Sequence, residues 1–174
     1  MKLKTERIIY SALFTAVLVI TAQLTVIAPL GIPITLQTFA VALCGYMLSA
    51  KWSVASILTY IVVGAVGLPV FSGFRGGIQH LIGPTGGFIV GFIFLSLFCS
   101  LNFIGAVKKI ISGLSGLIIC HIIGIFQYAF ITGNNLKISF ITISLPFLLK
   151  DIFCVVLAYI LSIKIIEITS KKRS

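Results

Sequence analysis

Long uncharged runs, interrupted by short polar or glycine- and proline-rich stretches, dominate the chain. Ile8–Ala50, Gly76–Val107 and Ile110–Leu136 contain no charged residue. A helix needs about 20 predominantly apolar residues to cross the roughly 30 Å hydrocarbon core of a bilayer. Glycines, prolines and charged residues divide the apolar sequence into six predicted membrane-spanning helices, at residues 8–28, 37–50, 53–68, 84–103, 110–131 and 146–167.

Composition supports the same interpretation. Of the 174 residues, 59% are hydrophobic and only 9% are charged, whereas soluble domains carry roughly 25% charged residues. Six spans leave too few residues for a separate soluble domain. We therefore expect one all-α integral membrane domain over residues 1–174, passing several times through the cell membrane.

The formal net charge of +10 reflects topology. No basic stripe is interleaved with exposed aromatic residues, so a nucleic-acid partner is not expected. If both termini are cytoplasmic, the excess of basic residues lies inside, as the positive-inside rule requires. The inner side then holds Lys2, Lys4, Arg7, Lys51, Lys108, Lys109, Lys164, Lys171, Lys172 and Arg173, and the outer side holds Arg75, Lys137 and Lys150.

Two outer connections contain candidate binding residues. Pro29–Gln37 is uncharged and apolar, which indicates an ordered cap over the bundle. Gly67–Gly87 holds seven glycines and two prolines, and glycines allow the backbone to approach a ligand closely. In this segment the candidate apolar walls are Phe71 and Phe74, and the candidate polar contacts are Arg75, Gln79, His80 and Thr85. Gln37 is a further polar group in an apolar outer segment.

Asp151 is the most informative ionisable residue. The other two acids, Glu6 and Glu167, lie at the inner ends of helices. An ionisable group within a span is costly and usually faces a cavity or a partner. Asp151 is therefore either an acceptor for N–H donors of a ligand or one half of a structural pair with Lys150 or Arg75. Arg75 itself either binds a ligand carboxylate through two parallel hydrogen bonds or is solvated.

Enzymatic chemistry is not supported. Acid–base catalysis usually needs a positioned carboxylate pair or a partnered histidine, and the other two acids lie at the opposite membrane face. His121 is interpreted as a hydrogen-bonded core residue. The four cysteines, Cys44, Cys99, Cys120 and Cys154, fall in apolar spans without CxxC spacing, so no metal site is expected. No nucleotide or other cofactor motif is present.

Four segments resemble the BioY family in order and spacing. They are Gly31-Ile-Pro-Ile-Thr-Leu-Gln-Thr38, Gly67-Leu-Pro-Val-Phe71, Gly83-Pro-Thr-Gly-Gly-Phe88 with Gly91-Phe92, and Pro146-Phe147 followed by Asp151. BioY proteins are biotin-binding S components of energy-coupling factor (ECF) transporters. The resemblance implies a six-helix S-component bundle with a pocket near the outer surface, covered by the loops after the first and third spans.

The resemblance also implies partners. Biotin would be captured outside and released inside when the whole S component topples in the bilayer. Energy would come from two ATPases acting through a transmembrane coupling subunit. Ala12 and Ala16 lie on one face of the first helix and allow close helix approach. This contact is either intramolecular packing or, as the resemblance implies, the contact with the coupling subunit.

Three positions depart from the family pattern. Cys154 stands where a lysine is common, Lys150 stands where a glycine is usual, and Ile89 stands where some members have a basic residue. We expect Asp151 to accept hydrogen bonds from the ureido N–H groups, and Arg75, or failing that Lys150, to pair with the valerate carboxylate. Phe71, Phe74 and Phe147 would contact the rings and chain of biotin. Another carboxylated cofactor such as lipoate, a small membrane enzyme and a structural membrane subunit are the alternatives.

Overall fold

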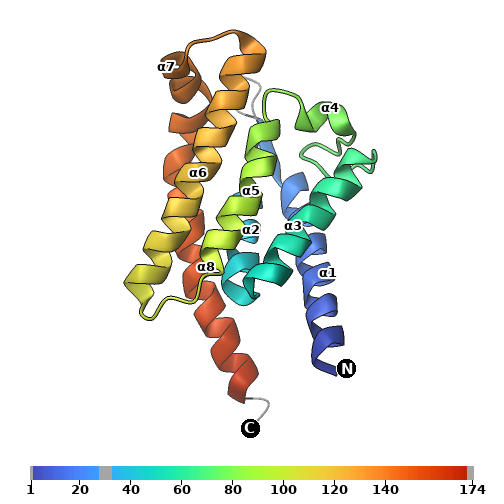
Figure 1. Ribbon diagram of the computed structural model, residues 1–174, viewed down its shortest axis with the longest axis vertical. Coiled ribbons are helices and arrows are strands. Elements are labelled where there is room, and N and C mark those ends of the chain that lie inside the picture. Colours follow the sequence, from blue (N-terminus) through green and yellow to red (C-terminus); the bar gives the residue numbers. More distant parts are fainter. Residues whose placement is uncertain (1, 28–32, 172–174) are drawn as a thin grey trace.

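The computed structural model describes residues 2–27 and 33–171 as a helical bundle (Figure 1). Its main helices are α1 (Lys2–Gln23), α2 (Gln37–Met47), α3 (Ala50–Ala65), α5 (Gly86–Cys99), α6 (Ala106–Thr132) and α8 (Leu145–Lys171). The short elements are β1 (Thr25–Ile27), β2 (Pro33–Thr35), α4 (Ile78–Leu81), α7 (Leu136–Ser139) and the π-helical turn η1 (Phe140–Ser144).

The main helices overlap the predicted ranges, but two are shorter than expected and one is shifted. α2 ends at Met47 and not at residue 50, α5 ends at Cys99 and not at 103, and α1 runs from Lys2 to Gln23 and not from 8 to 28. Three helical segments are long and apolar enough to cross a membrane: Thr5–Gln23, Ala106–Thr132 and Leu136–Lys171. Ala50–Ala65 and Gly86–Cys99 are apolar but shorter.

α2 is short because it lies in the centre of the bundle. It contacts α1, α3, α5 and α8, and eight of its 11 residues are buried. Because neighbouring helices and not lipid cover most of its surface, α2 needs only enough length to fill the core. Leu18, Ile57 and Val155, on α1, α3 and α8, are fully buried members of the same core cluster.

α5 and α6 pack against each other along small residues. Cβ atoms added to Gly87 and Gly91 of α5 would overlap the α6 backbone at Gly124 and Cys120, and one added to Gly116 of α6 would lie 3.1 Å from the Cα atom of Leu95. On each helix these positions are four residues apart, which places them on one face. Small residues at this spacing allow the two backbones to approach closely.

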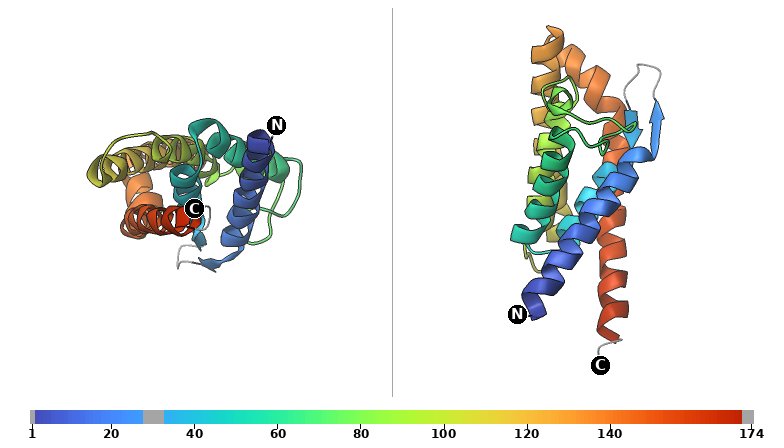
Figure 2. Two further views of the ribbon diagram at one scale, coloured as in Figure 1. Left: turned by 90° about the horizontal axis from the view of Figure 1, so that it is seen from below. Right: turned by 90° about the vertical axis from the view of Figure 1, so that its right-hand side faces the viewer.

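The two chain ends lie at one end of the bundle, and the connecting elements of the site lie at the other. In Figures 1 and 2 the β-hairpin, α4 and α7 are all at the end opposite the termini. β1 and β2 are antiparallel, with Thr25 paired to Thr35 and Val26 to Ile34. The predicted cap at 29–37 is therefore partly a strand, although residues 28–32 lie outside the described part of the chain.

We expect Gly87→Ala to lower the thermal unfolding midpoint of the protein purified in detergent. The new Cβ would lie 2.6 Å from the Ile123 carbonyl oxygen and 2.9 Å from Gly124 Cα. These are backbone atoms, so they can move away only if the helices separate, and overpacking of this kind costs roughly 1–3 kcal/mol. Ile118→Ala, on the exposed face of α6, is the control and should unfold like wild type. Equal midpoints for Gly87→Ala and wild type would contradict the close α5–α6 contact.

Candidate binding site

A cavity of about 590 Å³ opens at the end of the bundle opposite the termini. Its size falls within the roughly 300–1,000 Å³ of small-molecule sites. Residues of β2, α2, the α3–α5 connection, α5, α6, η1 and α8 line it. The predicted binding residues that line it are Gln37, Phe71, Arg75, Gln79, His80, Thr85, Phe147, Lys150 and Asp151.

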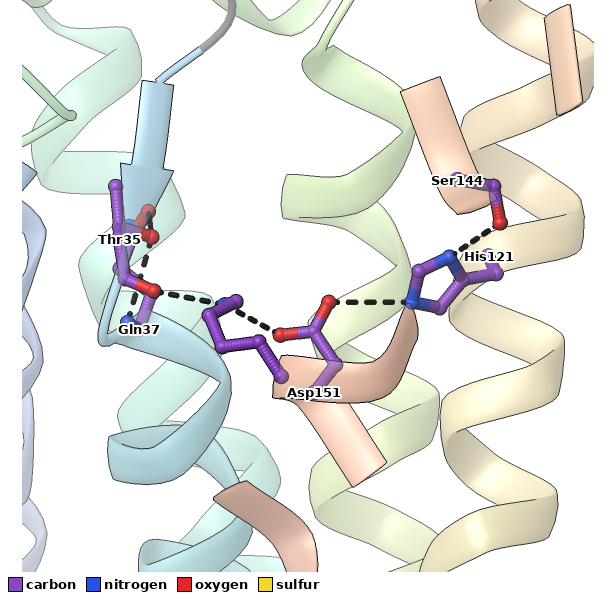
Figure 3. A network of polar contacts seen from close by, with 6 residues as sticks. Thr35, Gln37, His121, Ser144 and Asp151 are labelled. Atoms are coloured by element: carbon purple, nitrogen blue, oxygen red, sulfur yellow. Dashed lines mark hydrogen bonds and ion pairs between the residues drawn. The ribbon is translucent and has the colours of Figure 1, made fainter. Parts of the chain in front are cut away.

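Asp151 lies in the wall of the cavity, on the first turns of α8, and is 5% exposed. Its Oδ2 atom lies 3.2 Å from Nε2 of His121, and its Oδ1 atom lies 2.5 Å from Nζ of Lys150. In Figure 3 the Asp151 carboxylate lies between His121 on one side and Thr35 and Gln37 on the other. A buried charge is tolerated only when it is paired and hydrogen-bonded, and His121 and Lys150 meet that requirement.

The pairing with Lys150 was one of the alternatives left open by the sequence. Although adjacent helix positions point in different directions, Lys150 and Asp151 both line the cavity. They meet because the long lysine side chain bends back toward the carboxylate. The carboxylate is therefore shared between two partners, with Lys150 at Oδ1 and His121 at Oδ2.

Lys150 also links α8 to the β-hairpin. Its Nζ donates to the backbone carbonyl of Thr35 on β2 at 2.9 Å (Figure 3). Thr35 Oγ1 donates to Oε1 of Gln37 at 3.0 Å, and Gln37 Nε2 donates to the hydroxyl of the buried Tyr60 at 2.6 Å. A continuous polar network thus joins α3, α2, β2 and α8, and it keeps the hairpin beside Asp151.

The segment between α3 and α5 covers one side of the cavity. Phe71 is buried, with its ring against Gly64 and edge-on to Tyr60 at a centroid distance of 5.4 Å. Backbone hydrogen bonds pair Phe71 with Arg75. Gln23, the last residue of α1, donates to the carbonyls of Val70 and Phe71 and accepts from the backbone N–H of Phe74 at 2.8 Å. The end of α1 therefore holds this turn in place.

Phe74 does not line the cavity, contrary to the prediction. It is 72% exposed and has a φ of 56°. It belongs to the three-residue turn between the paired Phe71 and Arg75, and its backbone is left-handed, which is unusual for a bulky residue. The turn directs Phe71 inward and leaves Phe74 on the outer surface.

Arg75 contributes an uncompensated positive charge to the cavity. Arg75, Lys150 and Asp151 are the lining residues that carry formal charges. Lys150 and Asp151 neutralise each other, and among the described residues Arg75 makes no ion pair. Arg75 is exposed, whereas Asp151 is buried, so the cationic group lies nearer to solvent than the acceptor.

Some lining residues were not predicted as site residues. Phe88 and Phe92 of α5 and Tyr128 and Thr132 of α6 line the cavity. The structure confirms that His121 is a hydrogen-bonded core residue. Its partners are Asp151 and Ser144. Tyr128 and Thr132 are four residues apart on α6 and so share one helix face, a spacing that could have marked the cavity face in the sequence.

Other predicted features lie away from the cavity. Ala12 and Ala16 are exposed on α1, so they do not serve intramolecular packing. The four cysteines are buried and free, in agreement with their interpretation as core residues. Gln127 donates to the carbonyls of Leu81 and Gly83 at 2.7 Å each, and so satisfies backbone groups in the α4–α5 connection.

The fold and cavity define a class of protein: an apolar helical bundle that encloses a small-molecule site at one end. A crystal structure of the S component for biotin from an ECF-type ABC transporter has the same fold. The TM-score is 0.87 at 24% sequence identity, over 95% of this chain and 93% of that one.

Sequence comparison identifies the family. The BioY family profile matches residues 1–171, and the chain belongs to this family. The probable biotin transporter BioY of Pyrococcus horikoshii is 41% identical over 151 residues, which cover 86% of this chain and 90% of that protein. The biotin transporter BioY of Thermotoga maritima is 35% identical over 170 residues, which cover 92% and 95% respectively.

We expect Gln23→Ala to loosen the turn between Phe71 and Arg75 without unfolding the bundle. The substitution removes the donor to two carbonyls and the acceptor for the Phe74 N–H, and each such bond contributes about 1 kcal/mol. Hydrogen exchange measured by mass spectrometry should become faster for peptides covering this turn.

Thr21→Val is the control for this substitution, because the Thr21 hydroxyl bonds only within α1 among the described contacts. It should leave exchange in the turn unchanged. If Gln23→Ala also left exchange in the turn at the wild-type rate, Gln23 would not be what holds it.

Proposed function

We propose that this chain is the biotin-binding S component of an ECF-type vitamin importer. The observation that carries the proposal is the arrangement of polar groups in the cavity: a buried carboxylate acceptor at Asp151 and an unpaired cation at Arg75, nearer to solvent. Family membership and relatives named biotin transporters point to the same ligand.

The charges suit biotin. Biotin carries one carboxylate and a neutral ureido ring with N–H donors. Because Lys150 already compensates Asp151, a ligand with one negative charge would be balanced by Arg75, through the two parallel hydrogen bonds that arginine makes with carboxylates. The ureido N–H groups would donate to Asp151. The aromatic walls, Phe71, Phe88, Phe92 and Phe147, would contact the rings and the aliphatic chain.

The positions of the basic residues support one orientation in the membrane. The basic cavity residues, Arg75 and Lys150, lie at the cavity end together with Lys137 of α7, whereas both chain ends lie at the other end. We place the cavity on the outer side and both termini in the cytoplasm, in agreement with the positive-inside rule. All six main helices then belong to the membrane domain, and α2 needs no full span because protein surrounds it.

Transport requires partners. We propose that the chain works with a transmembrane coupling subunit and two ATPases, and that it releases biotin inside the cell by toppling. The exposed small residues Ala12 and Ala16 on α1 would allow a partner helix to approach closely. This assignment rests on the resemblance to S components.

The alternatives are less well supported. Ser144, His121 and Asp151 contact one another in the order of a hydrolase triad, but Ser144 is 1% exposed and does not line the cavity. A substrate there could not reach its hydroxyl, which argues against a hydrolytic enzyme. Lipoate has a carboxylate but no N–H donor, so it would donate nothing to the Asp151 carboxylate.

We expect Asp151→Asn to weaken biotin binding strongly in the purified protein. The neutral amide removes the charge that pairs with Lys150 and replaces one of the two acceptor oxygens by an NH2 donor, and loss of such a charged partner in a dry site costs roughly 2–5 kcal/mol. Isothermal titration calorimetry with biotin measures the change. Glu167→Gln, at the exposed opposite end of α8, is the matched control, and wild-type affinity in Asp151→Asn would refute the assignment.

We expect Arg75→Gln to weaken the binding of biotin but not of biotin methyl ester. The ester has no charge for Arg75 to balance, so wild type and variant should bind it equally. Lys137→Gln, which removes an exposed cation outside the cavity, should change neither affinity. Equal loss for acid and ester would show that Arg75 acts through loop structure, and tighter binding of lipoate than of biotin by wild type would overturn the biotin proposal.

A further inference from the structure

We propose that His121 and Ser144 form a positioning pair that fixes the orientation of the Asp151 carboxylate in the cavity wall. The inference rests on the proposed function, because it assigns how the acceptor for the ureido N–H groups is held. His121 and Ser144 themselves do not line the cavity, and they act through Asp151.

The pair is buried and fully engaged. His121 is 4% exposed; its Nε2 lies 3.2 Å from Asp151 Oδ2 and its Nδ1 lies 2.8 Å from Ser144 Oγ (Figure 3). The imidazole ring is also edge-on to Phe88, at a centroid distance of 5.4 Å and an interplanar angle of 89°. With both nitrogens bonded and one edge packed, the ring has a single orientation.

The proton positions follow from the partners. An ionised carboxylate only accepts hydrogen bonds, so Nε2 of His121 must carry a hydrogen. A neutral ring then accepts at Nδ1, and the Ser144 hydroxyl donates to it. Ser144 thus selects the tautomer that donates to Asp151.

Ser144 owes its position to the irregular backbone before α8. It is the last residue of the π-helical turn η1, Phe140–Ser144. π-Helical turns inside α-helices are rare and often occur at functional sites. Here the turn lies between α7 and α8, and its last residue reaches the His121 ring of α6.

The consequence concerns the two carboxylate oxygens of Asp151. His121 occupies Oδ2, which stops the carboxylate from rotating. Oδ1 contacts Nζ of Lys150, so the carboxylate is held from two sides, and in the proposed function this fixed carboxylate accepts the ligand N–H. Without His121 both oxygens could turn toward Lys150, and the acceptor would lose its fixed direction.

Two amide substitutions test this assignment. The side-chain amide of glutamine reaches to where Nε2 lies, whereas that of asparagine reaches only to Nδ1. His121→Gln should keep a donor to Asp151 and bind biotin within about threefold of wild type. His121→Asn should lose that donor and bind about tenfold more weakly, because hydrogen bonds to charged groups are the stronger ones. Calorimetric titration with biotin gives both values.

A ligand analogue separates positioning from general packing. A biotin methylated at both ureido nitrogens has no N–H to donate, so its affinity should be the same for wild type, His121→Gln and His121→Asn. If both variants lost affinity equally for biotin and for the analogue, the role of His121 would be packing and the inference would be wrong. Wild-type biotin affinity in His121→Asn would also overturn it.

Ser144→Ala provides a second test that leaves the ring in place. It removes the donor to Nδ1 and should weaken biotin binding severalfold. The control is Ser139→Ala, because Ser139 is equally buried in the same connection but bonds only to the Asn135 carbonyl. Equal effects of the two serine variants would contradict tautomer selection, even if neither histidine variant could be purified.

The inference and the proposed function fail differently. If wild type binds biotin and Asp151→Asn does not, the proposed function stands whatever the His121 and Ser144 variants do. If wild type does not bind biotin, the proposed function is wrong, and His121 and Ser144 have no role in biotin binding.

Discussion

The ion pair of Asp151 with Lys150, reinforced by His121, is the interaction on which the cavity depends. A carboxylate in an apolar bundle must be compensated, and the two compensating groups come from different directions. Lys150 also donates a hydrogen bond to the Thr35 carbonyl of the β-hairpin, and His121 is hydrogen-bonded to Ser144 of the π-helical turn. One buried charge thereby connects α6, α8, β2 and η1 at the end of the bundle where the cavity opens.

The remainder of the bundle provides a rigid support for this network. Glycines bring α5 and α6 into backbone contact, and the buried helix α2 carries Gln37 at its first position, against Tyr60. The cover over the cavity is an irregular segment held by individual side-chain bonds, among them those of Gln23 to the turn after α3 and of Gln127 to Leu81 and Gly83. This contrast suits a binding protein, because ligand entry requires a cover that opens more easily than the walls.

The site combines a neutral, hydrogen-bonding interior with a positive opening. Lys150 cancels the charge of Asp151, and Arg75 stays unpaired within the described part of the chain. A lysine at position 150, rather than one turn later at Cys154, also accounts for the tie to β2, because Lys150 Nζ reaches the Thr35 carbonyl. The change of position relative to the family pattern thus couples the paired acid to the hairpin.

The sequence by itself determined that the chain is an apolar helical bundle, the approximate helix ranges and the choice of Asp151 as the lone acid within a predicted span, because charge scarcity and the position of an acid are properties of the residues alone. It also indicated the outer loops, because glycine and proline restrict the backbone locally. The tertiary structure decided which of Lys150 and Arg75 pairs with Asp151, why α2 is short, that Phe74 points outward and that His121 holds the carboxylate. These outcomes depend on contacts between residues far apart in the chain, such as His121 with Asp151 and Thr35 with Lys150, and no local pattern encodes the distance between such residues.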